Sequence, residues 1–156
     1  MSRILSRQYE KAVHSALERC QFIEETLRMC IADAIDIAKF QLAPYYPLKW
    51  TYADVSKLSM GKLVDIFCRI NDDSKLKKSL NCITNERNYV AHQSLLFTIG
   101  ESQDKNYMNE QIAKIDGIRD RAILVHNTLL DARYDLHEKL MVLELQNSKK
   151  KIGNAA

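Results

Sequence analysis

One short segment, residues 87–92, combines three side chains that together could act on a phosphodiester. Arg87 supplies a permanent cation, whose planar fork of N–H donors matches a phosphate. His92 carries the side chain whose unperturbed pKa lies near neutrality, so it can take up and return a proton. Asn88 adds an amide next to the cation. This combination predicts chemistry on a phosphodiester without a metal ion.

The spacing of these residues sets a geometric condition. On a helix, Asn88 and His92 are four positions apart and share a face. Arg87 and His92 are five positions apart, or about 140° around the axis. They converge on one phosphate only if the arginine side chain swings round. Two such helices facing each other across a dimer axis would build a cleft with two copies of each side chain.

The composition predicts a helical scaffold for this segment. The chain has 156 residues, of which 46% are apolar, so it can bury the core of a single domain. It has four Gly and two Pro, and both prolines fall in one short stretch, which favours long helices. The net charge of +3 permits contact with nucleic acid without demanding it. We expect one domain over residues 1–148 and a flexible basic tail over 149–156.

Apolar residues recur at intervals of three and four over residues 5–42 and again over 105–145, which predicts two long helices. Shorter helices are predicted over 59–70 and 75–97, and Thr51 with Asp54 matches a capping box. The expected inner positions of the short helices are Leu63, Ile66, Phe67, Ile70, Leu76, Leu80, Ile83, Val90, Ala91 and Leu95.

The fold class that follows is all-α, an elongated antiparallel helical bundle with two long terminal helices. Because the long helices outreach the short ones, part of their apolar seams would lie bare in a monomer. This favours a two-fold homodimer.

The cysteines and the chain start predict the cellular setting. Cys20, Cys30, Cys68 and Cys82 form no C-x-x-C pair, so we expect reduced core residues rather than zinc ligands. No apolar run approaches the length of a membrane span, and the first residues lack the apolar centre of a secretory signal. We therefore expect a cytoplasmic protein with no membrane contact, metal or other cofactor.

The segment Glu86-Arg87-Asn88-Tyr89-Val90-Ala91-His92 resembles the R-x4-6-H motif of the HEPN superfamily, which lies late in a helical bundle and often has Asn directly after the Arg. The preceding Leu58-Ser59-Met60-Gly61-Lys62-Leu63 is similar to the helix start that often comes before this motif. The resemblance in motifs covers about residues 58–96, and the bundle layout extends it loosely over the chain.

The resemblance implies a HEPN-like homodimer that acts as a metal-independent endoribonuclease, of the toxin or antiviral defence type. His92 would activate the ribose 2′-hydroxyl or protonate the leaving oxygen, Arg87 would hold the scissile phosphate, and Asn88 would orient one of them. A cognate antitoxin or a larger defence assembly is an implied partner. Toxin members often carry Tyr two residues after the His, where this chain has Ser94, so silencing by nucleotide transfer onto that position is not expected.

Several alternatives stay open at this point. The same fold could serve as a non-catalytic dimerisation or nucleotide- or partner-binding module, or as a purely structural coiled-coil-like dimer, with Arg87 and His92 on an ordinary polar face. Lys75 and Lys78 could guide an RNA strand or simply be solvated. Trp50, with the tyrosines around it, could stack RNA bases or close the end of the bundle.

Overall fold

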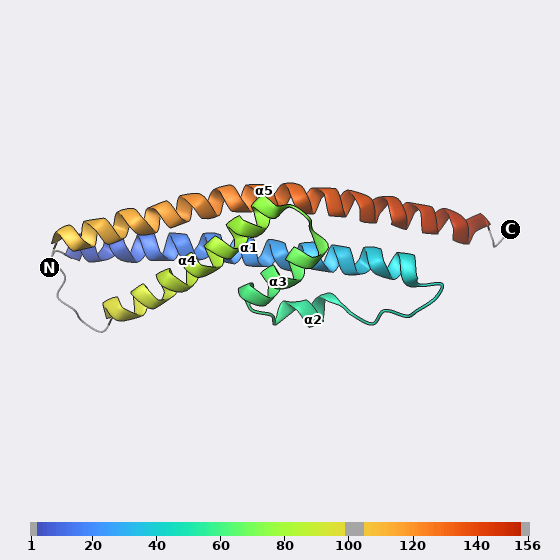
Figure 1. The fold of residues 1–156 in the computed structure, drawn as a ribbon, viewed down its shortest axis with the longest axis horizontal. Coiled ribbons are helices and arrows are strands. Elements are labelled where there is room, and N and C mark those ends of the chain that lie inside the picture. Colours follow the sequence, from blue (N-terminus) through green and yellow to red (C-terminus); the bar gives the residue numbers. More distant parts are fainter. Residues whose placement is uncertain (1–2, 99–104, 154–156) are drawn as a thin grey trace. The chain divides into compact units, whose positions relative to one another are not determined.

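The computed structural model describes residues 3–98 and 105–153, and the side chains within 5–94 and 105–149. All regular structure in this part of the chain is helical, which confirms the all-α class (Figure 1). The helices are α1 (Arg3–Leu42), α2 (Tyr52–Ser56), α3 (Met60–Ile70), α4 (Ser74–Thr98) and α5 (Lys105–Gly153). None of them, over the described residues, is both long and apolar enough to cross a membrane.

The helix ends follow the sequence closely except at the end of α5. That helix continues past Leu145 to Gly153, so it includes the first residues of the segment 149–156. The flexibility of this segment stays a prediction, and residues 154–156 lie outside the described part. So do residues 99–104 and the side chain of Leu95, one of the expected inner positions.

Two acidic side chains fix helix starts that the sequence predicts. The Asp54 carboxylate accepts hydrogen bonds from the backbone N–H of Thr51 at 2.7 Å and from its hydroxyl at 3.0 Å, which closes the first turn of α2. Asp73 Oδ1 accepts from the backbone N–H groups of Lys75 at 2.9 Å and Leu76 at 3.0 Å. These bonds at Asp73 satisfy N–H groups that the first turn of α4 leaves without an intrahelical partner.

The chain divides into two compact units. Unit 1 comprises residues 1–24 and 73–128, and unit 2 comprises 25–72 and 129–156. Helix α4 belongs to unit 1, whereas α2 and α3 belong to unit 2, and α1 and α5 contribute one part to each. The single domain expected over residues 1–148 stays a prediction.

Unit 1 consists of three packed helices, with its core between α1, α4 and α5 (Figure 1). Its buried cluster consists of Tyr9, Ala12, Val13, Ala16, Val90, Met108, Ile115 and Ile118. Tyr9 clusters with Met108, and further along both helices Phe22 stacks on His126, with the ring centroids 6.0 Å apart. Within this unit α1 and α5 therefore run parallel.

Helix α4 runs in the opposite direction to α5. The hydroxyl of Tyr89 donates to Gln111, whereas Glu86, earlier on α4, pairs with Arg121, later on α5. Within unit 1, the expectation of an antiparallel bundle thus holds for α4 against α5 but is wrong for α1 against α5. The reason is topological, because α4 leads the chain back toward the beginning of α1 before α5 starts.

Unit 2 has its own buried residues on each of its helices. Leu27 and Cys30 of α1, Leu63 and Phe67 of α3, and Leu129 of α5 are fully buried. The short helix α2 is held against α1, because the hydroxyl of Tyr52 donates to Glu25 Oε1 at 2.7 Å. Arg28 of α1 also contacts the segment between α2 and α3, because its Nη2 donates to the carbonyl of Leu58 at 3.4 Å.

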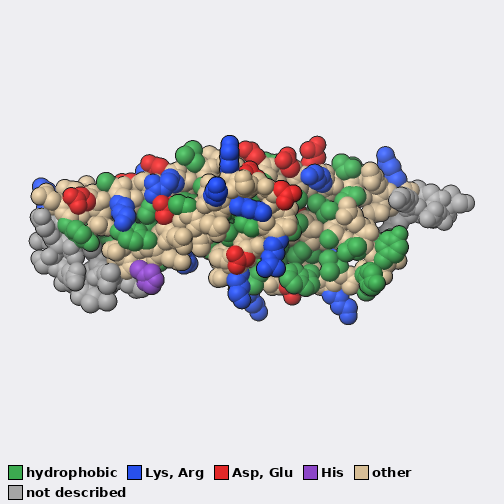
Figure 2. Space-filling model, in the orientation of Figure 1, with side chains coloured by type: hydrophobic (Ala, Val, Ile, Leu, Met, Phe, Trp, Pro, Cys, Tyr) green, Lys and Arg blue, Asp and Glu red, His purple; other side chains and the backbone are tan. Residues whose placement is uncertain are grey.

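Two features of the surface differ from the expected core, and a third concerns the aromatic segment around Trp50. Ile70, the last residue of α3, is 46% exposed, because it follows the last turn that packs inward. Cys82 is exposed and Cys68 half-buried, so only Cys20 and Cys30 are core thiols. The segment between α1 and α2 carries exposed aromatic residues, and Figure 2 shows apolar side chains gathered over it.

Candidate functional site

The residues of the predicted site all lie on the middle and later turns of α4, in unit 1. This helix is held in place by Leu76, Leu80, Ile83 and Val90, which are buried and recur on one side of it. Asn88 and His92 lie on the opposite side and are both exposed. The structure therefore presents an amide and an imidazole, one helical turn apart, to an incoming ligand.

The backbone of Arg87 lies on a different side of α4 from Asn88 and His92. Arg87 follows Ile83 by four positions and Leu80 by seven, so its backbone position shares the inner side with them, and its side chain is partly buried. The guanidinium turns back toward the exposed side, where its Nη1 donates to Asn88 Oδ1 at 3.3 Å. The structure thus joins Arg87 to Asn88, and Asn88 shares its face with His92.

The electrostatic surroundings of Arg87 reach into the core. Burial raises the pKa of the Cys20 thiol on α1 to about 11, and the positive charge of Arg87 acts in the opposite direction on that thiol. The charges of Glu86 and Glu24 raise the pKa of the same thiol and so act against that of Arg87. Among the described residues, the guanidinium of Arg87 has no carboxylate partner.

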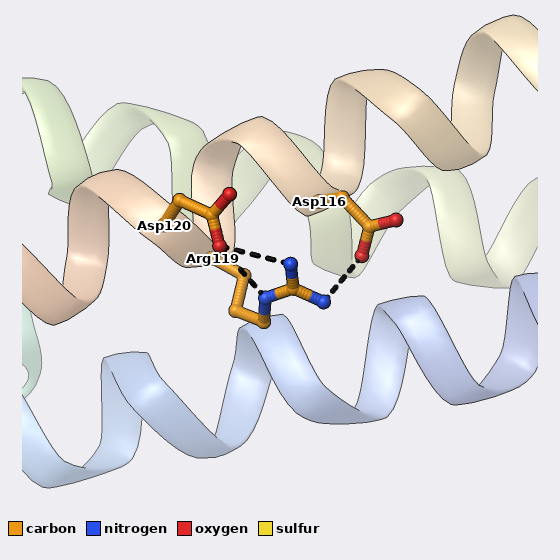
Figure 3. A network of polar contacts seen from close by, with 3 residues as sticks. All are labelled: Asp116, Arg119 and Asp120. Atoms are coloured by element: carbon orange, nitrogen blue, oxygen red, sulfur yellow. Dashed lines mark hydrogen bonds and ion pairs between the residues drawn. The ribbon is translucent and has the colours of Figure 1, made fainter.

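Two other arginines of unit 1, Arg119 and Arg121, are neutralised by carboxylates. Arg119 donates from Nη1 to Asp116 Oδ1 at 2.6 Å and from Nε and Nη2 to Asp120 Oδ1 at 3.0 and 2.9 Å (Figure 3). Arg121 forms an ion pair with Glu86 of α4, which raises the pKa of that guanidinium. Arg87 differs from both in keeping most of its N–H donors available for an anion from outside.

Two other residues near the motif have structural partners. Tyr89 packs against the core of unit 1, its hydroxyl donates to Gln111 Oε1 at 2.7 Å, and Lys114 Nζ lies 3.8 Å from its ring centroid. The hydroxyl of Ser94 donates to the carbonyl of Ala91 at 2.8 Å. Tyr89 therefore anchors α4 to α5 and leaves the exposed face to its neighbours.

The predicted RNA-binding residues fall in both units. Lys75 and Lys78 are exposed on the first turns of α4, the helix that carries the site. Trp50 is 50% exposed but belongs to unit 2, so the candidate site is built from unit 1 alone. Sequence reasoning missed Asn81 and Asn85, which are exposed on α4 between the lysines and Asn88. Their spacing was the signal that could have revealed them.

Within the described residues, no group of three or more His, Cys, Asp or Glu side chains is placed to hold a metal ion. Comparisons of the chain with models of protein families, with curated proteins and with solved structures found no match. A functional assignment thus rests on the residues of α4 and their geometry.

Proposed function

We propose that this chain is a HEPN-like, metal-independent endoribonuclease of the toxin or defence-effector type, which acts as a homodimer. The observation that supports this proposal best is the arrangement on α4. An exposed imidazole and an exposed amide share one face, and the amide holds a guanidinium that has no carboxylate partner among the described residues. These are a proton carrier and an anion binder within reach of one substrate.

The chemistry assigned to these groups is transphosphorylation. His92 removes the proton of a ribose 2′-hydroxyl, whose oxygen attacks the adjacent phosphorus. The bond to the 5′-oxygen of the next nucleotide breaks, and that oxygen takes up a proton. The products are a 2′,3′-cyclic phosphate and a 5′-hydroxyl. Arg87 stabilises the negative charge that builds on the phosphate oxygens, and Asn88 orients its guanidinium.

The homodimer is included in the proposal because the reaction uses two proton transfers. Attack and departure occur on opposite sides of the phosphorus, so a base and an acid must stand on opposite sides too. Over its described side chains, α4 offers a single imidazole. Of the other histidines of unit 1, His126 is partly buried and stacked on Phe22, and His14 lies on α1 rather than on the helix that carries the site. A second copy of α4 supplies the second imidazole.

The test is cleavage of single-stranded RNA in the presence of EDTA. We expect His92→Ala to lower the cleavage rate by about 10²–10⁴-fold, the usual contribution of a positioned acid or base. His14→Ala is the matched control, because His14 is also an exposed histidine of unit 1, on α1. Cleavage by His92→Ala at the wild-type rate would refute the assignment, and loss of wild-type cleavage in EDTA would refute its metal independence.

The products and the cellular effect separate this proposal from its alternative. Mass spectrometry of the fragments should find cyclic phosphate at the 3′ ends. Expression of the wild type should slow cell growth, and expression of His92→Ala should not. A wild type that forms dimers but leaves both RNA and growth untouched would instead support a non-catalytic dimerisation or nucleotide- or partner-binding module.

A further inference from the structure

The exposed side of α4 carries a continuous line of polar residues. Lys78, Asn81, Asn85, Asn88 and His92 recur at intervals of three or four, and each is exposed. At 100° per residue they fall within about 80° of the helix circumference. Lys75 lies about one turn closer to the start of the helix, about 60° outside that arc. We call these six residues the α4 stripe.

The stripe contains no carboxylate. The acidic side chain that α4 does carry, Glu86, lies outside the stripe and is paired with Arg121. The exposed residues of α5 in the same unit mix both signs, as in Glu110, Lys114 and Asp120. A face that carries cations and amides without acids is suited to a polyanion rather than to water alone.

The asparagines are unusual for a face that is only solvated. Asn ranks well below Ala, Glu and Lys in helix propensity, because its side chain competes for backbone hydrogen bonds. Asn81, Asn85 and Asn88 nevertheless occupy the middle of a helix, where Glu or Lys would be more favourable. An amide offers both donors and acceptors, which a charged side chain cannot, and this is what base and sugar edges require.

We infer that the α4 stripe is the binding track for the single-stranded RNA that the proposed nuclease cleaves, and this inference rests on that proposed function. Lys75 and Lys78 contact phosphates, and Asn81 and Asn85 hydrogen-bond to bases or sugars. The strand is thereby guided to His92. The stripe is about 26 Å long at 1.5 Å per residue. At about 3.4 Å per stacked nucleotide it accommodates at most about eight nucleotides.

Single-stranded RNA fits this face better than a duplex does. Unstacked bases expose their hydrogen-bonding edges to side chains, whereas the deep major groove of an A-form duplex hides them. From Lys78 to His92 the stripe is one row along the helix and so presents contacts along a line. Such a row tracks one backbone and its bases.

The experiment measures binding separately from cleavage. The probe is a fluorescent RNA of about eight nucleotides with 2′-O-methyl groups, which cannot form a cyclic phosphate. The test variant is Asn81→Asp/Asn85→Asp, in which each change keeps the size of the side chain and adds a negative charge near a phosphate. We expect each substitution to weaken binding about fivefold, and the double variant about 25-fold.

The matched control is Asn106→Asp/Asn127→Asp, which makes the same changes at exposed positions of α5 in unit 1. It should bind like the wild type. A second variant, Lys75→Ala/Lys78→Ala, should make the salt dependence of binding shallower, by about 0.7 in the log–log slope for each lysine. This variant also tests the stripe if the aspartates disturb the helix, which circular dichroism would reveal.

The outcomes distinguish the track from the nuclease. Equal affinities for the test and control variants, or an unchanged salt slope for the lysine variant, would overturn the track even if the wild type cleaves RNA through His92. Selective weakening in the stripe variants would support the track even if the wild type proved inert in the cleavage assay. Failure of the wild type to bind the probe at all would overturn the track.

Discussion

A heterodimer that carries one wild-type chain and one His92→Ala chain should be nearly inactive. The described side chains of α4 include one imidazole, whereas transphosphorylation uses a base and an acid on opposite sides of the phosphorus. If each copy supplies one of them, removing a single His92 disables the shared site. The expected rate is about 10²–10⁴-fold below the wild type, the usual contribution of one positioned acid or base.

The assay uses two affinity tags. The wild type and His92→Ala are expressed together with different tags, and only particles that carry both tags are retained by sequential purification. Their cleavage of single-stranded RNA in EDTA is compared with that of the two homodimers. A heterodimer of the wild type with His14→Ala serves as the control and should keep full activity, because His14 lies on α1.

The activity of the heterodimer distinguishes a shared site from two independent sites. Two independent sites would leave the heterodimer with half of the wild-type activity, because one of its two chains stays intact. In a random one-to-one mixture, a shared site predicts about a quarter of the wild-type activity, and independent sites predict about half. Retention of half the activity by the purified heterodimer, or failure of the two tags to copurify, would refute the shared site.

Three further predictions concern the scaffold. A maleimide should label Cys82 in the folded chain but not Cys20 or Cys30. Burial raises the pKa of the Cys20 thiol to about 11 and that of the Cys30 thiol to about 12. Mass spectrometry of the intact protein, labelled before and after unfolding in urea, would count the modified cysteines. Phe67→Ala should lower the free energy of unfolding by about 3–5 kcal/mol in a urea titration, since Phe67 is fully buried, and a negligible loss would contradict this. Burial lowers the pKa of His126 below 6.5, so as the pH falls this imidazole is protonated in the unfolded chain before it is protonated in the folded chain. The stability from this group should be complete above pH 6.5 and decline below it in thermal melts, and His126→Gln should remove that pH dependence.

The sequence predicted the helices because apolar spacing depends on local geometry. Tyr9, Cys20 and Leu27 follow the three-and-four spacing that predicted the helix over residues 5–42, and all three are buried. The end of α3 shows where this reasoning stops, because Ile70 follows the apolar spacing yet remains exposed. Spacing identifies the side of a helix, but it does not say how far along that side a neighbour extends.

The periodicity of the sequence could not predict the relative direction of α1 and α5. An apolar seam has the same spacing whether its partner runs parallel or antiparallel, so nothing in residues 5–42 or 105–145 specified that α1 and α5 run parallel within unit 1. The path of α4 in that unit decides it. The contacts that establish it, such as Phe22 with His126, join residues about a hundred positions apart in the sequence.

The site was predicted in part for the same reason. That Asn88 and His92 share a face follows from their spacing, and the structure exposes both. The bond from Arg87 to Asn88 did not follow, because a long side chain chooses its path from its surroundings. Asn81 and Asn85 were missed because single asparagines carry little information until their common face is known.

The state of Arg87 connects stability with the proposed function. A partly buried cation without a carboxylate is unfavourable, since each unmade hydrogen bond of a charged group carries a desolvation penalty. Arg119, which is also partly buried, avoids this penalty through aspartate partners, and a carboxylate beside Arg87 would do the same. It would also repel a phosphate. An arginine kept without an acidic partner, next to an exposed amide and imidazole, is therefore what a site that recruits its anion from RNA requires, and binding of that anion should stabilise unit 1 in proportion to its affinity.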